Sequence, residues 1–317
     1  MSNRIIFIGE PETDAGLFAT RARADFPNLD LLATNDREQA RQQVENADAL
    51  IGHAFQFDED LLLRARQLRW IQSLTTGTDA ILRLASLRAE VTVTSTRGMH
   101  GPQMSELVFL QMLALLRNFP RMQRNQAAHA WKRWPQPLLW GKTAVIVGVG
   151  AIAEVLAPRC KAFGMTVYGV SGAARKPAGF DEVFGRDQLH RAAALADFLV
   201  LIVPYTPQTE KLIDAAVIAA MKPGAYLINV ARGGVLDEHA LLAALREQRL
   251  AGAALDVFRE TPLPPDHPLW NEEKVIITPH IGGMSTIYLE QAYPIVRDNL
   301  RRFLAGEPHA MTNIVPH

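Results

Sequence analysis

Short apolar runs alternate with helical patterns along nearly the whole chain, and this alternation limits the folds that the chain can adopt. Runs rich in valine, isoleucine and leucine are typical of strands buried on both faces of a parallel sheet, with the intervening helices as crossovers. Before residue 99 the pattern predicts helices such as 36–45 and 58–65, and strands at 4–9, 29–33, 49–52, 69–73 and 91–94. These elements predict one small doubly wound α/β unit.

A second and denser alternation begins at Thr143. Helices are predicted at 151–163, 215–221 and 238–248, and strands at 143–148, 166–170, 198–203, 225–230, 253–257 and 275–278. Six strands in this rhythm match the two mononucleotide-binding halves of a Rossmann sheet. The chain is therefore expected to contain two doubly wound parallel sheets.

Two further segments flank the second alternation. A long helix is predicted from about residue 101 to 130, and the run WKRWPQPLLW follows it. The prolines of that run exclude a regular helix, so it predicts an arm that packs on another surface, for which a second subunit is one candidate. Residues 285–304 are again helical in pattern and could return to the first unit.

Length and charge restrict the class of protein. The chain has 317 residues, 48% of them hydrophobic, and its formal net charge is zero. This length predicts two domains with ample cores, and the balanced charge provides no reason to expect nucleic acid or a membrane as a partner. Cys160 is the only cysteine, which fits a reducing compartment. Glu10 and Asp14 follow the short N-terminal apolar run too closely for a signal peptide, and the run 198–203 is too short to cross a bilayer, so we expect a soluble cytoplasmic protein.

The run TAVIVGVGAIAEVLA has the features of a dinucleotide-binding loop. A buried strand ends at Gly148, and Gly150 has no side chain, so the backbone can approach a pyrophosphate. The helix that begins at Ala151 points its N-terminal N–H groups at that anion. Ala153 takes the place of a third glycine and is small enough for close packing of helix on strand. These residues and Ile152 form the predicted pyrophosphate site.

The choice between NAD and NADP is made at the end of the next strand. NAD-selective sites place an acidic residue there for the ribose hydroxyls, but Ser171 stands at that position in this chain. Arg175 and Lys176 follow closely and could pair with a 2′-phosphate. The alternative is that both are solvated loop charges. We expect NADP to be preferred over NAD.

The runs that surround this loop resemble one family nearly end to end. They are IQSLTTGTDAI, VGVGAIAEVLA, VPYTPQT, LINVARGGVLDEHALLAALREQRLAGAALDVF, PLPPDHPLW and VIITPHIGG. The chain resembles the D-isomer-specific 2-hydroxyacid dehydrogenases, which reduce 2-keto acids with a nicotinamide cofactor. PLPPDHPLW and the expected NADP site favour the glyoxylate/hydroxypyruvate reductase branch.

The resemblance implies a fold that the order of elements does not. In this family the Rossmann dinucleotide-binding domain is inserted into a flavodoxin-like substrate-binding domain. The expected boundaries are 1–98 with 283–317 for the substrate domain and 99–282 for the Rossmann domain. The segment of about 101–140 resembles the family's dimerisation region, which implies a homodimer, and the active site is expected in the cleft between the domains.

Reduction of a 2-keto acid requires a bound carboxylate, a polarised keto group and a proton donor. Arg232 in NVARGG and His280 in ITPHIGG each follow a predicted strand end, where such sheets place ligands. A guanidinium can form two hydrogen bonds to substrate oxygens, and an imidazole can donate a proton near neutral pH. By resemblance Arg232 binds the substrate and His280 is the acid/base; an ordinary surface arginine and a core histidine are the alternatives.

Further site positions come from the resemblance alone. The backbone N–H groups of Thr76 and Gly77 resemble the carboxylate-binding loop, and His53 lies near the equivalent pocket wall, although a histidine without function is as good a reading. The positions that resemble the nicotinamide half of the cofactor site are Val203, Pro204, Ala231 and Asp256. Val230 and Gly283 are further expected cofactor-binding positions. The Asp256 carboxylate could stabilise the positive charge of the oxidised ring.

One departure from the family pattern affects the proton donor. The family has a glutamate directly before the proline of the PLP run, paired with the histidine, but in DVFRETPLP this position is Thr261 and Glu260 comes one residue early. Three readings stay open. Glu260 reaches His280 through the shape of the loop, Thr261 orients the imidazole as a neutral partner, or the protein has drifted from catalysis.

Other motifs predict packing rather than chemistry. Cys160 lies on the helix after the glycine loop, where packing is the expected role. The remaining histidines, such as His100, His129 and His190, lack metal-ligand spacing, and no metal is expected.

Two other functions fit parts of the sequence. A formate dehydrogenase of the same fold would need a longer N-terminal part and a glutamine at position 261. An NAD(H)-sensing corepressor would keep the glycine loop and could lose catalytic residues, which Thr261 favours and which Arg232 and His280 oppose.

Overall fold

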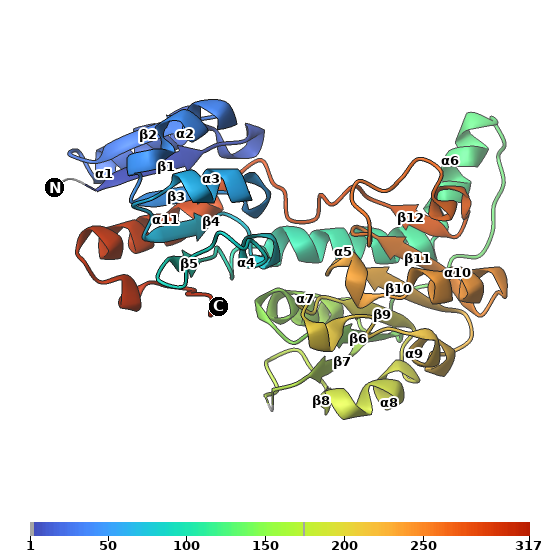
Figure 1. Cartoon of the computed structure of the whole chain (residues 1–317). Coiled ribbons are helices and arrows are strands. Elements are labelled where there is room, and N and C mark those ends of the chain that lie inside the picture. The colour runs from blue at the N-terminus through green and yellow to red at the C-terminus, as the bar shows by residue number, and fades with distance from the viewer. Residues whose placement is uncertain (1–2, 174) are drawn as a thin grey trace. The chain divides into compact units, whose positions relative to one another are not determined.

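The computed structural model describes residues 3–173 and 175–317. The chain divides into two compact units, one formed by Met1–Met99 with Met284–His317 and the other by His100–Gly283. In Figure 1 the first unit therefore carries both the blue N-terminal and the red C-terminal ends of the colour scale. The insertion of the second unit into the first, each built on one parallel sheet, confirms the predicted fold class.

The first unit is a five-stranded parallel sheet in the order β2-β1-β3-β4-β5, which is the flavodoxin-like order. Its strands are β1 (Arg4–Ile8), β2 (Asp30–Thr34), β3 (Ala49–Gly52), β4 (Trp70–Ser73) and β5 (Thr92–Thr94). These strands lie within two residues of the predicted ones at each end, because each is a short apolar run covered on both faces.

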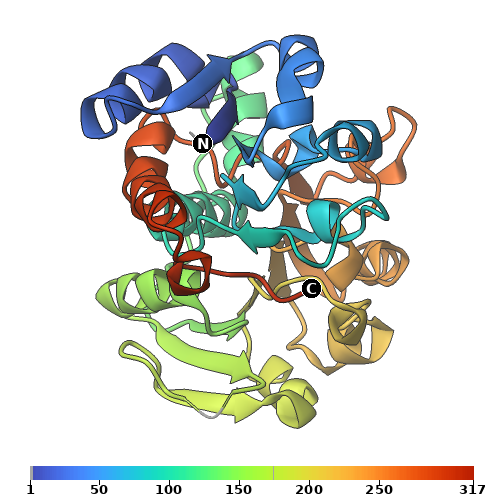
Figure 2. The same ribbon diagram turned by 60° about the vertical axis from the view of Figure 1, so that its left-hand side comes forward.

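Helices cover both faces of this sheet. One face packs against α1 (Ala15–Asp25) and α11 (Tyr288–Leu304), with Phe7 stacked on Phe18 at 3.8 Å between ring centroids. The C-terminal helix thus returns to the first unit as expected, and it can be followed beside the blue elements in Figure 2. The opposite face carries α2 (Arg37–Gln43) and α3 (Glu59–Arg64), and α4 (Asp79–Leu82) follows β4.

The second unit is a parallel sheet in the order β12-β11-β10-β9-β6-β7-β8. Its strands are β6 (Thr143–Val147), β7 (Thr166–Ser171), β8 (Glu182–Gly185), β9 (Phe198–Leu201), β10 (Ala225–Asn229), β11 (Leu250–Leu255) and β12 (Val275–Ile277). The order reverses between β6 and β9, and ligands of such sheets bind at this switch point.

Helices again form two layers. One face packs against α5 (Gly101–Leu116) and α7 (Ala151–Ala162), and the other against α8 (Leu189–Ala193), α9 (Ala215–Ala220) and α10 (Glu238–Arg246). Among the described residues, no helix combines the length and the apolar character needed to cross a membrane.

Two predictions for the second unit are wrong. The sheet has seven strands among the described residues rather than six, because β8 is a half-exposed edge strand whose EVFG sequence lacks an apolar run. The single helix expected over 101–130 is two helices, α5 and α6 (Phe119–Ala127), separated by Asn118. Asn118 adopts a left-handed backbone (φ 51°), and its side chain accepts a hydrogen bond from the Arg121 N–H, so it caps the second helix. The residues after α6 are not helical, as predicted from their prolines.

Candidate active site

The glycine loop lies at the switch point of the second sheet. Gly148 follows β6 with φ 105°, and a Cβ atom there would come 2.7 Å from the backbone nitrogen of Val203, which follows β9. Both the left-handed backbone and the close approach exclude a side chain. The predicted Gly148 position is therefore the point at which the ends of β6 and β9 meet.

The next residues form a helix start suited to an anion. Gly150 is the N-cap of α7, no side chain caps the helix there, and a Cβ at Gly150 would face open space. Ala151 and Ile152 form the first turn, and Ala153 is fully buried against the sheet. N–H groups that converge on open space at a helix N-terminus fit the pyrophosphate of a dinucleotide.

The two cations singled out in the sequence lie in the segment after β7, at the predicted ribose end of the cofactor site. The Arg175 guanidinium donates to the carbonyl of Val149 (2.9 Å) within the glycine loop and pairs with Glu154 of α7 (2.5 Å). Lys176 donates to the carbonyl of Asp181 (2.6 Å). Ser171 ends β7, and its hydroxyl accepts the N–H of Ala173 (3.0 Å). Both cations thus already have protein partners.

Arg232 is carried by a turn that a buried asparagine shapes. Asn229, the fully buried last residue of β10, accepts the N–H of Ala231 (3.0 Å) and donates to the carbonyl of Arg232 (3.1 Å). The Arg232 guanidinium donates to the carbonyl of Ala231 (2.7 Å), and its side chain is half-buried. Asn229 was not predicted from the sequence, although a polar residue at the end of an apolar strand run is the signal that would have revealed it.

His280 lies in a loop that one carboxylate holds. The residue has φ 56°, which is uncommon for a residue with a side chain. Asp256, which is 1% exposed, accepts the Thr278 hydroxyl (2.5 Å) and the N–H groups of Ile281 (3.1 Å) and Gly282 (3.0 Å). Both carboxylate oxygens thus face the His280 loop, a contact that the predicted nicotinamide role of Asp256 did not include.

The strand register brings these groups to one edge. Asn229 of β10 pairs with Leu255 of β11, which pairs with Ile277 of β12, so the three strands end at one level. The loop of Arg232 and the loop of His280 therefore emerge from the same sheet edge, on either side of the loop that follows β11.

The loop after β11 packs directly on the Arg232 turn. A Cβ at Gly233 would lie 1.9 Å from the carbonyl carbon of Phe258, so only glycine fits there. The N–H of Arg259 donates to Glu238 at the start of α10 (2.8 Å), and its guanidinium pairs with Glu210 (2.8 Å). These contacts hold the backbone that leads into Glu260 and Thr261.

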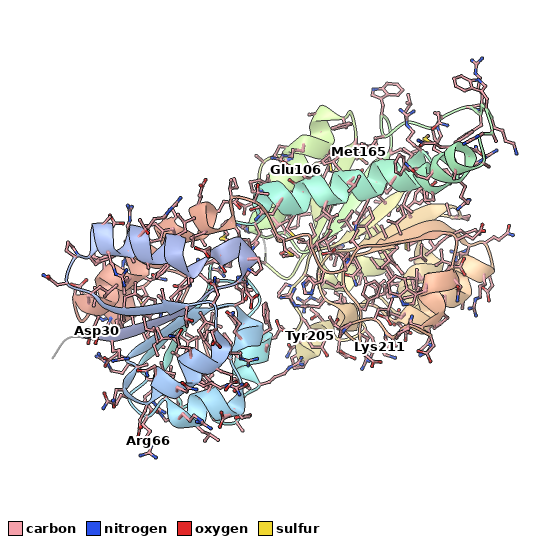
Figure 3. The ribbon with its side chains drawn as sticks, turned by 90° about the horizontal axis from the view of Figure 1, so that it is seen from above. Asp30, Arg66, Glu106, Met165, Tyr205 and Lys211 are labelled. Carbon is pink, nitrogen blue, oxygen red and sulfur yellow. The ribbon has the colours of Figure 1, made fainter. Side chains whose placement is uncertain are left out.

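Glu210 also accepts a hydrogen bond from the hydroxyl of Tyr205, which lies in the segment after β9 and is labelled in Figure 3. The Tyr205 hydrogen bond, and after it the Arg259 guanidinium, hold the pKa of Glu210 below its usual value. Glu210 is therefore ionised across the neutral range and keeps its bond to Arg259.

Glu260 and Thr261, the two candidates to replace the missing glutamate, both have exposed side chains. Thr261 is exposed and its hydroxyl donates to the carbonyl of Phe258 in its own loop (3.4 Å), while the Glu260 side chain is exposed. In this conformation the Thr261 hydroxyl is therefore hydrogen-bonded to the backbone.

The remaining cofactor assignments lie where strands end. Val203 and Pro204 follow β9, and Val230 and Ala231 follow β10. Gly283 accepts a hydrogen bond from the Gln103 side chain of α5 (3.3 Å).

The substrate-binding residues assigned to the first unit cluster at the carboxyl end of its sheet. His53 directly follows β3, is 3% exposed and shares a hydrogen bond with the buried Thr13 hydroxyl (3.1 Å). Thr76 and Gly77 lie between β4 and α4, and the Thr75 hydroxyl donates to the carbonyl of Gly77 (2.7 Å). The neighbouring strands β3 and β4 pair in register, which brings these two loops to the same edge.

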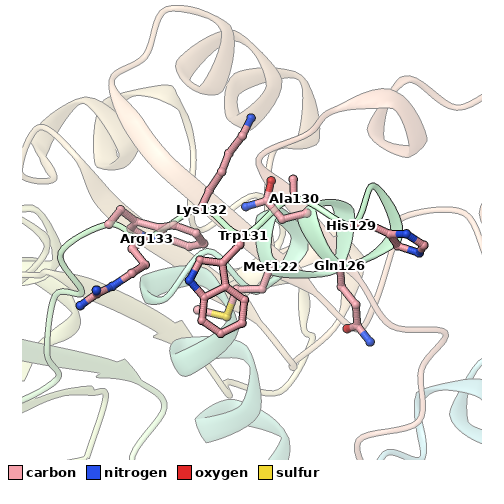
Figure 4. A pocket seen from close by; sticks show the side chains of 9 residues that line it. Met122, Gln126, His129, Ala130, Trp131, Lys132 and Arg133 are labelled. Atoms are coloured by element: carbon pink, nitrogen blue, oxygen red, sulfur yellow. The ribbon is translucent and has the colours of Figure 1, made fainter.

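A hollow elsewhere in the second unit contains none of these residues. It lies at the end of α6 and is lined by the segment 129–134 with Met122, Asn125 and Gln126 (Figure 4). Within the described ranges, no group of three or more histidine, cysteine or acidic side chains is placed to hold a metal ion.

Residues 109–282 match the family described as D-isomer specific 2-hydroxyacid dehydrogenase, NAD binding domain, which is more than half of the chain. The chain belongs to this family. Its sequence is 34% identical over 284 residues to a glyoxylate reductase of Thermococcus litoralis, and the match covers 84% of this chain and 83% of that protein. The chain spans about half the length of other relatives, namely D-3-phosphoglycerate dehydrogenases such as that of Methanocaldococcus jannaschii.

Solved structures of the family share the fold over their whole length. A family protein from Aeromonas salmonicida is 35% identical, with a TM-score of 0.90 and 99% of both chains covered. An NADPH-dependent glyoxylate/hydroxypyruvate reductase from Sinorhizobium meliloti, solved with NADP and sulfate, is 27% identical, with a TM-score of 0.86 and 99% of this chain and 98% of that chain covered. The predicted family is confirmed.

Proposed function

We propose that this chain is an NAD(P)H-dependent reductase of small 2-keto acids of the glyoxylate and hydroxypyruvate type. One observation carries the proposal. Arg232 and His280 follow the ends of β10 and β12, the strands on either side of β11, in a sheet whose switch point carries a helix N-terminus suited to a pyrophosphate. The bound nicotinamide supplies the hydride, and the side chains described above supply the rest of the chemistry.

Each residue has a defined task in this reaction. The Arg232 guanidinium binds the substrate's carboxylate and keto oxygens, and the turn that Asn229 holds fixes its direction. His280 donates the proton that the keto oxygen takes up in reduction and accepts it in oxidation. We assign further donors for the carboxylate to the backbone of Thr76 and Gly77, and a wall of the pocket to His53. Because Thr261 stands where the family has a glutamate beside the histidine, we expect keto-acid reduction to fade at a lower pH than in relatives that have the glutamate.

We propose NADP as the preferred cofactor. No acidic side chain follows β7 at Ser171 to repel a 2′-phosphate, and cationic residues follow instead. The related reductase of Sinorhizobium meliloti was solved with NADP.

We also propose a cytoplasmic homodimer that associates through the arm. Trp131 is 94% exposed and Trp140 is 75% exposed, and a second copy would cover this apolar surface. Light scattering of the purified protein tests the dimer, and a monomer at micromolar concentration would contradict it.

A panel of glyoxylate, hydroxypyruvate and a bulky 2-keto acid, each with NADH and NADPH, tests the activity by loss of absorbance. We expect turnover of the small acids, a strong loss of kcat in His280→Gln and a strong rise of KM in Arg232→Gln. Glu273→Gln, an exposed change outside the site, is the control. Binding of NADPH without oxidation by any keto acid would favour the alternative, a nucleotide-binding regulatory module, to which the departure at Thr261 gives weight.

A further inference from the structure

A third cation lies at the ribose end of the cofactor site, and the sequence did not single it out. Arg186 begins the short 3₁₀ helix Arg186–Gln188 directly after β8. Strand β8 pairs with β7 so that Gly185 lies opposite Ser171. Arg186 is therefore brought beside the end of β7, where Rossmann sheets recognise the adenosine ribose.

The guanidinium itself reaches over that strand end. Its Nη2 atom lies 3.7 Å, and its central carbon 4.0 Å, from the position that a Cβ at Gly172 would take. Gly172 follows Ser171 and has no side chain, so the space above the end of β7 is open to a side chain from the neighbouring strand. The edge strand β8 thus supplies a cation to a position that β7 leaves open.

The other two cations at this end are committed to partners within the protein. Arg175 pairs with Glu154, and Lys176 donates to the carbonyl of Asp181. The Asp181 carboxylate accepts Lys161 (2.9 Å), and hydrogen bonds from Val167 and Lys161 lower its pKa, so it is charged at neutral pH. Within residues 3–173 and 175–317, the Arg186 guanidinium forms no hydrogen bond or ion pair, and its charge is available to a ligand.

We propose that Arg186 binds the 2′-phosphate of NADP and is the main determinant of cofactor choice, an inference that rests on the proposed nicotinamide-dependent function. A guanidinium offers a planar pair of N–H groups to phosphate oxygens, and it is always charged. Arg175 then acts mainly on the glycine loop, through the carbonyl of Val149, and only secondarily on the phosphate.

The test compares Arg186→Gln with the wild-type protein in two assays. The first measures kcat/KM of glyoxylate reduction with NADPH and with NADH. Loss of a charge-assisted hydrogen bond to phosphate is expected to lower the NADPH value about 10- to 100-fold and to change the NADH value less than about twofold. The second measures calorimetric binding of adenosine 2′,5′-bisphosphate and of 5′-AMP, which needs no turnover.

Arg191→Gln is the matched control. It removes the same charge from the next helix of the same edge, where the Arg191 guanidinium lies over the Phe184 ring (5.4 Å). We expect it to leave both cofactors unaffected, and unchanged melting temperatures show that neither variant unfolds.

The outcomes separate this inference from the proposed function. If the wild type binds the bisphosphate more tightly than 5′-AMP and Arg186→Gln keeps that difference, the role of Arg186 is overturned while the NADP preference stands. An NADPH-specific loss in Arg175→Gln instead would move the role to Arg175. If the wild type binds both nucleotides equally, the NADP preference fails and the role of Arg186 fails with it. Binding of the bisphosphate without any keto-acid turnover would leave Arg186 supported and the proposed reaction refuted.

Discussion

The substitution Asp256→Asn separates two roles for this buried side chain. The structure has its two carboxylate oxygens accepting three hydrogen bonds from the His280 loop. An asparagine offers one oxygen and one NH₂ group. With its oxygen toward Thr278 and Ile281, the NH₂ group meets the N–H of Gly282. With the reverse orientation the NH₂ group meets the N–H of Ile281, while the Thr278 hydroxyl can turn to accept from it.

The magnitude follows from the least costly orientation. One buried N–H group without an acceptor costs roughly 1–3 kcal/mol of unfolding free energy. For a unit of roughly 150–250 residues each kcal/mol lowers Tm by about 2–4 °C, so the Tm of the protein without cofactor should fall by about 2–12 °C. The left-handed conformation of the His280 backbone costs about 1–2 kcal/mol, so this backbone then relaxes. A shift of the imidazole by about 1 Å lowers kcat on the order of 100-fold.

Calorimetry without cofactor and steady-state kinetics with NADPH measure the two effects. Asp266→Asn, an exposed change in the loop after β11, is the control and should alter neither. An unchanged Tm together with weaker NADPH binding would refute the bracing of the loop and restore the nicotinamide role predicted from the family.

Three further outcomes are expected. Gly233→Ala places a Cβ 1.9 Å from the Phe258 carbonyl carbon, which should cost about 1–3 kcal/mol of stability. The variant should therefore have a Tm lower by several degrees and a lower kcat/KM. Wild-type values of both would show that the two loops move apart easily. Burial raises the pKa of the Cys160 thiol to about 12, so a thiol reagent at pH 8 should label the protein only in denaturant, and fast labelling of the native protein would contradict the buried position. Thr261→Glu places a carboxylate where the family has one, and a carboxylate favours the protonated imidazole. The variant should therefore have a higher apparent pKa of kcat/KM for reduction and keep its activity to higher pH. An unchanged apparent pKa would reject the pairing of residue 261 with His280. A shift toward lower pH in Glu260→Gln would show instead that Glu260 already serves His280.

Much of the fold could be read from local patterns. Strands covered on both faces leave uninterrupted apolar runs, and nearly all of these were found. The edge strand β8 was not, because exposure on one side removes the run that marks a buried strand. The break at Asn118 was missed for another reason: the apolar spacing continues across it, and only the asparagine followed by Pro120 signals a new helix start.

The candidate site was likewise predicted only in part from the sequence. The glycine loop, Arg232 and His280 were singled out because each lies just after a predicted strand and matches the family's motifs, and both signals are visible in the sequence. The partners of these residues were not found. Asn229 was not singled out, and Asp256 was assigned to the nicotinamide rather than to the His280 loop. The hydrogen bonds of both residues exist only because β10, β11 and β12 lie side by side and end at one level.

The sequence by itself determined that this chain forms two parallel sheets, that one carries a dinucleotide loop, and which arginine and histidine follow the strand ends, because periodicity and glycine placement act over a few residues. The tertiary structure alone decided which carboxylate braces the His280 loop and which cation reaches the end of β7. Those contacts join residues 14 to 26 positions apart (Gly172 to Arg186, and Asp256 to Gly282), and strand register sets them rather than local sequence.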